Sequence, residues 1–137
     1  MNWYVVLAGL PASTLAPLQR VLRVAARVVL NPKPRDHISS ALGELHWLPI
    51  GEQVVYKLYF LVHKASLGQS PDYITDLLQP VAATSSRSSL WDASRGDYVV
   101  PRTNRKMADR AFSTAAPQAW NQLPTVLKRT QSTSAFR

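Results

Sequence analysis

Histidines are the residues best suited to chemistry in this chain, because imidazole can bind a metal ion or move a proton near neutral pH. The 137 residues include three His, eight acidic residues and no Cys. His37 and His46 lack further ligands at metal-site spacing, and Asp36 is only a sequence neighbour of His37. His63 follows Tyr59 by one helical turn, so we expect a hydrogen-bonded packing pair. The histidines predict neither a metal site nor an acid–base catalyst.

The other reactive side chains also lack the partners that catalysis requires. Ser113 has no nearby His to act as its base, and no two acidic residues are adjacent. Pro71-Asp72 looks like the start of a restriction-type nuclease motif, but no acid-x-Lys triplet follows it, so a metal site would be incomplete. We expect no enzymatic activity, no cofactor and no small-molecule substrate.

Positive charge is the main functional signal in the sequence. The chain has 16 Lys and Arg residues and a formal net charge of +8. Because the Arg guanidinium pairs bidentately with phosphate, an Arg-rich excess favours an RNA or DNA partner. The candidate phosphate-contacting residues are Arg20, Arg23, Arg27, Arg102, Arg105, Lys106 and Arg110.

Both groups of basic residues have a second interpretation. Arg20, Arg23 and Arg27 share one helix face, and the pattern alone favours a solvated face over a phosphate-contacting ridge. The group at 102–110 lies close in sequence to Trp91 and Tyr98, whose rings could stack on the bases of a single strand while Arg holds its phosphates. A solvated loop remains the equal alternative there.

Helical periodicity predicts a mainly α-helical small domain. We expect helices over 13–30, 36–43, 49–68 and 72–79, of which 49–68 is the longest and is partly covered on both sides. The apolar stripe of the first helix consists of Leu15, Leu18, Leu22, Ala25 and Val29. The fourth helix carries Asp72 and Asp76, which would repel phosphate, so the charge pattern argues against a helix-turn-helix motif.

The second half of the sequence predicts irregular structure followed by a packing segment. Residues 81–97 are rich in Ser and Ala and predict a loop. We expect at most a short two-stranded β element near 98–114, which Phe112 and Ser113 could continue. Pro117 could then start a short helix. The large apolar side chains Phe112 and Trp120 have no titratable partners, so this segment is expected to pack rather than react.

Seven segments occur in a characteristic order. They are LAGLPASTLAPLQRVLRVAARVVL, RDH, ELHWLPI, YKLYFLVHKASLGQSPDYITDLL, SRSSL, VVPRT and DRAFSTAAPQAWNQLP. Together they resemble the C-terminal, post-polymerase segment of non-LTR (LINE) retrotransposon reverse transcriptases, with CR1-like and jockey-like groups nearest in pattern. The resemblance extends from about Val5 to Arg137.

The resemblance implies that the polymerase body lies upstream of this segment. In that family, an adjacent pair of palm aspartates binds the two metal ions of nucleotide addition, and a nuclease domain lies further upstream. No acidic residue here matches that pair. We therefore expect a non-catalytic fragment of an RNA-directed DNA polymerase. It would form one truncated domain with a remnant at 1–12, a helical half at 13–80, a basic loop region at 81–110 and a packing segment at 111–137.

Two functions remain open at this point. The fragment either contacts RNA or DNA through its basic surface, or serves as a packing module for the upstream polymerase region with no independent activity. The sequence has no apolar run of membrane-spanning length, and its opening lacks the positive start of a signal peptide. We expect an intracellular protein, cytoplasmic or nuclear, that is neither secreted nor inserted in a membrane.

Overall fold

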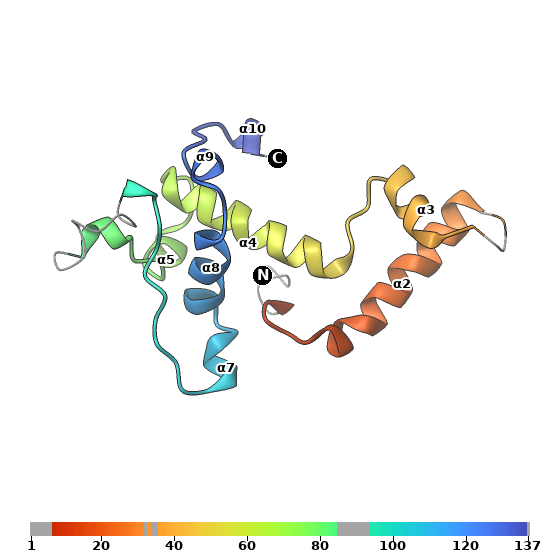
Figure 1. Cartoon of the computed structure of the whole chain (residues 1–137), viewed down its shortest axis with the longest axis horizontal. Helices are drawn as coiled ribbons and strands as arrows, with labels where there is room; N and C mark the ends of the chain where they lie inside the picture. Colours follow the sequence, from red (N-terminus) through yellow and green to blue (C-terminus); the bar gives the residue numbers. More distant parts are fainter. Residues whose placement is uncertain (1–6, 32, 34–35, 85–93, 137) are drawn as a thin grey trace.

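Two long helices, α2 (Ala12–Leu30) and α4 (Ile50–Ser66), dominate a mainly α-helical fold. The computed structural model describes residues 7–31, 33, 36–84 and 94–136 (Figure 1). The predicted fold class, a mainly α-helical small domain, is confirmed by these helices. The shorter helices are α3 (Ile38–Glu44), the 3-10 helix η1 (Val81–Ala83), α5 (Asp72–Thr75), α7 (Lys106–Asp109), α8 (Phe112–Asn121), α9 (Thr125–Lys128) and α10 (Thr133–Phe136).

Helix α2 has nearly the expected bounds. Pro11 precedes its first residue, and Asn31 ends it in a left-handed conformation with φ 44°, where its N–H bonds Arg27 O. Asn tolerates that conformation better than most residues, which explains the end point. Helix α2 has 19 residues and α4 has 17, so the prediction that the helix near 49–68 is the longest was wrong.

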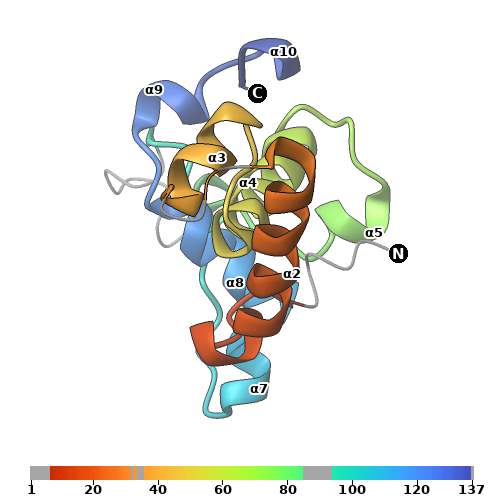
Figure 2. The same ribbon diagram turned by 90° about the vertical axis from the view of Figure 1, so that its right-hand side faces the viewer.

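Helix α4 lies at the centre of the hydrophobic core. Its buried residues Val54, Leu58, Val62 and Ala65 recur every three or four positions and therefore share one face. That face packs against α8, and both views show the two helices against each other (Figures 1 and 2). Helix α8 contributes Phe112, Ala116 and Trp120 to the same core. Burial of each large side chain there contributes about 1.5–3 kcal/mol.

Helices α2 and α3 form an arm at the N-terminal end of α4. Helix α2 packs on both α3 and α4, and the arm lies on the opposite side of the picture from α5 (Figure 1). The side chain of Gln19 anchors the arm, because its Oε1 accepts a hydrogen bond of 2.8 Å from Ile50 N. The expected α2 stripe was partly wrong, since Leu18 and Val29 are exposed whereas Ala26 is fully buried. Among the described helices, α2 packs mainly on α3 and α4, so a narrow strip of α2 is covered.

The expectation of at most a short two-stranded β element near 98–114 is confirmed, but its continuation through Phe112 and Ser113 was wrong. Among the described residues, β-type pairing is limited to an isolated antiparallel bridge between Pro80 and Tyr98. Phe112 and Ser113 begin α8 instead of continuing a strand, and Pro117 lies inside that helix rather than at its start. Spacing of four between successive core residues places them on one face of α8, and their burial outweighs the disfavoured internal proline.

The expected helix over 72–79 is shorter, and the expected loop over 81–97 contains ordered contacts. Helix α5 ends after Thr75, and η1 occupies the start of the predicted loop. Residues 85–93 of that loop lie outside the described residues. Near its end, Asp97 is buried and forms an ion pair with Lys128, which also donates to Asn121 O at 3.0 Å.

The segment around Tyr98 is fixed to the end of α8 by side-chain hydrogen bonds. Asn121 Oδ1 accepts from Tyr98 N at 2.9 Å, and Asn121 Nδ2 donates to Tyr98 O at 2.8 Å. Trp120 Nε1 donates to Gly96 O at 3.0 Å. These bonds give the backbone groups of Tyr98 and the carbonyl of Gly96 side-chain partners. Phe112 and Trp120 are buried, as expected for packing residues.

His63 is a packing residue, but its partner differs from the predicted Tyr59. The His63 ring is fully buried, and its Nε2 lies 2.7 Å from Thr130 O. It stacks on Phe136 of α10 with ring centroids 4.2 Å apart. This contact ties the C-terminal segment to the far end of α4, so both sides of α4 are covered there, as expected.

Candidate nucleic-acid surface

Arg20, Arg23 and Arg27 lie on the exposed side of α2. Their spacing of three and four residues places them on one helix face. Arg20 and Arg23 line a hollow of about 410 Å³ that also includes Ile50 and Gly51 at the start of α4. Arg27 lies about 6 Å further along the helix axis than Arg23. The three Arg residues therefore form an exposed basic row along α2.

The second basic group surrounds helix α7. Arg102, Arg105 and Lys106 are exposed, and Arg110 is half-buried at the end of the helix. Lys106 and Arg110 line a hollow of about 580 Å³ together with Gly9 and the acidic residue Asp109. The structure therefore brings two of the four cations of this group together, whereas Arg102 and Arg105 lie in the segment that leads into α7.

A close contact connects α7 to the segment that precedes α2. Gly9 has φ +70°, and a Cβ placed on it would lie 2.9 Å from Arg110 Cγ. Pro11 and Lys106 line the same hollow. Figure 2 shows α7 below the start of α2. The segment before α2 therefore lies against α7, whereas Arg20, Arg23 and Arg27 follow along α2, which runs away from α7 (Figure 1).

The seven candidate cations have no acidic partners within the described part of the chain. The ion pair found there joins Lys128 to Asp97, and neither belongs to these groups. Asp109, the acid nearest in sequence to the second group, accepts a hydrogen bond from the Thr103 hydroxyl. The positive charge of both groups is therefore left for solvent, counterions or a polyanion to neutralise.

The prediction that the Tyr98 ring could stack on bases beside the second basic group was wrong. Its side chain is buried and packs edge-on against Trp120 with ring centroids 6.4 Å apart. Burial also raises the pKa of the Tyr98 hydroxyl. The ring has no free face for a base, because Tyr98 belongs to the core. Trp91, the other expected aromatic, lies outside the described residues.

The histidines are placed apart from one another. His37 and His46 are exposed, whereas His63 is buried in the core. No three His, Cys, Asp or Glu side chains gather into a metal-binding group in the described ranges. Within the described residues, the histidines and acidic side chains therefore do not come together as a metal site.

The sequence interpretation missed a groove between α2 and α4. Its volume is about 650 Å³, and its lining is mostly apolar. Val21, Val24 and Val28 are exposed on α2 beside it. Their spacing of three and four residues was visible in the sequence as a second apolar stripe. None of the described helices combines the length and apolarity needed to cross a membrane.

Comparison of the chain with protein-family models, with curated proteins and with solved structures found no match.

Proposed function

We propose that this chain is a non-catalytic C-terminal segment of a retrotransposon RNA-directed DNA polymerase that contacts RNA or DNA through its basic surface. The observation that carries the nucleic-acid role is the set of seven cations without acidic partners in the described residues, six of which are exposed. The ordered motifs shared with LINE-type enzymes support the parent. An intracellular location, cytoplasmic or nuclear, belongs to the same proposal.

The proposed contact is electrostatic and independent of base sequence. Each Lys or Arg that neutralises a phosphate releases a counterion, so affinity falls linearly with salt on logarithmic axes. The slope is about 0.7 per contact for single strands and about 0.9 for duplex DNA. If all three Arg residues of α2 contact a single strand, they account for about two units of slope.

A salt titration of nucleic-acid binding tests this proposal. Fluorescence anisotropy would follow labelled single-stranded RNA, single-stranded DNA and duplex DNA between about 50 and 200 mM salt. The first variant replaces Arg20, Arg23 and Arg27 with Gln. The matched control replaces Lys33, Arg95 and Arg129, three exposed cations outside both groups, so that net charge changes equally. Binding should weaken and the slope should drop mainly in the α2 variant.

Two results would contradict the nucleic-acid role. Affinity that does not change with salt would exclude phosphate contacts, and equal loss in both triple variants would show that only net charge matters. The parent is tested separately by sequencing the transcript. A reading frame that runs upstream into a paired-aspartate polymerase core supports the retrotransposon origin, whereas a frame without that core argues against it.

The exposed valines of α2 favour a second candidate function, a packing module for the polymerase body. Monomeric proteins rarely expose contiguous apolar patches unless these patches meet a partner. An isolated packing module should aggregate or bind hydrophobic dyes, whereas an independent binding domain should remain monomeric and unfold cooperatively. Dye binding combined with no salt-dependent RNA or DNA affinity would favour the packing module.

A further inference from the structure

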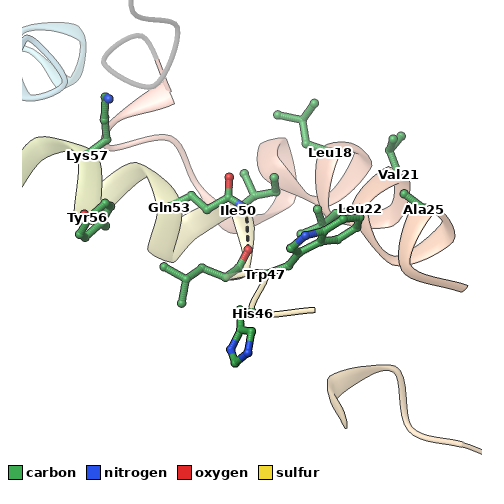
Figure 3. A pocket seen from close by; sticks show the side chains of 11 residues that line it. Leu18, Val21, Leu22, Ala25, His46, Trp47, Ile50, Gln53, Tyr56 and Lys57 are labelled. Atoms are coloured by element: carbon green, nitrogen blue, oxygen red, sulfur yellow. Dashed lines mark hydrogen bonds between the residues drawn. The ribbon is translucent and has the colours of Figure 1, made fainter. Parts of the chain in front are cut away.

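The apolar groove between α2 and α4 is open to solvent along one side. Figure 3 shows Leu18, Val21, Leu22 and Ala25 on α2, with Trp47 between them and the α4 residues Ile50, Gln53, Tyr56 and Lys57. Leu18 at 39% and Leu48 at 44% remain accessible although they line the groove. The groove therefore presents apolar surface that the rest of the described chain does not cover.

A stripe of valines extends this apolar surface along α2. Val21, Val24 and Val28 are 68%, 60% and 77% exposed. With Leu18 they follow the spacing i, i+3, i+6 and i+10 and cover about 15 Å of the helix axis. A helix of about three turns matches that length, and helices bind apolar grooves through residues at this spacing.

The charged residue that lines the groove and the charged residues of α2 are all positive. Arg20 and Arg27 lie four residues before and three residues after Val24, so they border the stripe on its outer side. Lys57 lines the opposite side of the groove on α4. Helix α2 contains no Asp or Glu, and no acidic residue lines the groove. An occupant needs an apolar face with acidic residues along its edges to match this surface.

We propose that the groove and the valine stripe bind an amphipathic helix of a partner protein that carries acidic residues along both edges of its apolar face. The apolar face of the partner covers the valines and enters the groove. Its acidic residues pair with Lys57 on one side and with Arg20 and Arg27 on the other. This inference goes beyond nucleic-acid contact, because phosphates would use the Arg face and leave the valines in water.

Charge disfavours a second copy of this chain as the occupant. Two α2 helices packed through their valine stripes would bring together six Arg residues and no acids. Like charges at such an interface oppose association. An acidic helix removes that repulsion and gains from the same three cations that border this apolar surface.

A peptide-binding titration on the full chain tests the inference. The probe is a labelled synthetic peptide of about 14 residues, with Leu at i, i+3, i+4 and i+7 and Glu at the flanking positions. A second peptide has Lys in place of each Glu. The test variant combines Val24→Gln and Val28→Gln, and the matched control is Val126→Gln on α9, where the side chain is 80% exposed. Circular dichroism checks that each variant retains its helices.

The Glu peptide should bind as a 1:1 complex, about tenfold or more tighter than the Lys peptide. The double variant should weaken Glu-peptide binding about tenfold, because two exposed anchors are lost, whereas the α9 control should stay within about twofold. NMR shifts of the unmodified chain should map to residues 18–28 of α2 and to residues 47–57, which lead into α4 and form its start.

Four outcomes would overturn the inference. These are the absence of binding, equal affinity for both peptides, equal weakening by the α9 control, and peptide-induced shifts outside α2 and the start of α4. A chain that sediments as a dimer, and becomes a monomer in the double variant, would identify a second copy as the occupant instead. The NMR map requires no substitution, so a misfolded variant still leaves the inference open to refutation.

Discussion

Replacement of Lys128 with Met should destabilise the fold strongly through the ion pair with Asp97. The Lys128 and Asp97 side chains are only 1% and 8% exposed. Loss of the ammonium leaves a buried carboxylate without its partner, which costs about 3–5 kcal/mol. At roughly 2–4 °C per kcal/mol for a chain of this size, the midpoint of thermal unfolding should fall by about 6–20 °C.

Urea unfolding followed by Trp fluorescence measures this loss, since Trp120 is buried and reports on the same region. Replacing both partners, Lys128→Met with Asp97→Leu, should recover much of the lost stability, because no unpaired charge remains. Arg129→Met is the matched control, since Arg129 is exposed and should lose less than about 1 kcal/mol. A cost below about 1 kcal/mol for Lys128→Met would refute the role of the ion pair.

Three further perturbations probe other contacts. Gly9→Ala should lower the free energy of unfolding, measured in urea, more than Gly68→Ala does. Both glycines have positive φ, but of the two only a Cβ at position 9 would lie within 3 Å of another residue. Equal losses would contradict the contact with α7. His63→Phe should keep the aromatic stack but leave Thr130 O without its partner, with a loss of about 1–3 kcal/mol measured by thermal unfolding; an unchanged midpoint would exclude that hydrogen bond as a stabilising contact. Burial raises the pKa of Tyr98 above 10.0, so the unfolded chain loses this proton at a lower pH than the folded chain. The free energy of unfolding should therefore fall as pH rises above 10, until the hydroxyl of the folded chain also ionises. Urea midpoints should show this fall in the unmodified chain and less of it in Tyr98→Phe.

The parts of the fold set by local pattern could be predicted from the sequence. Pro11 and Asn31 mark the two ends of α2, and the spacing of Val54, Leu58 and Ala65 identifies the buried face of α4. Phe112 and Trp120 are large apolar residues without titratable neighbours, so their burial was expected. In each case the information lies within a few helical turns of the residue concerned.

The contacts that could not be predicted join residues distant in sequence. Lys128 and Asp97 are 31 residues apart, and each looks like an ordinary surface charge in its own segment. His63 and Thr130 are 67 residues apart. Tyr98 lies close in sequence to a basic group, yet the Asn121 side chain holds it in the core. Such pairings depend on tertiary packing, which local periodicity does not encode.

The candidate surface could likewise be predicted only in part from the sequence. The excess of Lys and Arg and their positions indicated which cations to consider, and helical spacing indicated that Arg20, Arg23 and Arg27 share a face. Their lack of acidic partners in the described residues became visible only from the positions of the acids in space. The contact of Gly9 with Arg110, which brings the start of α2 to α7, has no signal in either local segment.

The packing of α4 against α8 sets the order in which this protein can fold during synthesis. Helix α4 leaves the ribosome well before α8 and the ion pair that follows it. About 60 residues separate Ala65 from Lys128, which takes roughly 3–12 s at about 5–20 residues per second. Throughout that interval the apolar face of α4 has no permanent cover. Nascent chains at this stage should bind chaperones, and a stalled ribosome should make them prone to aggregate.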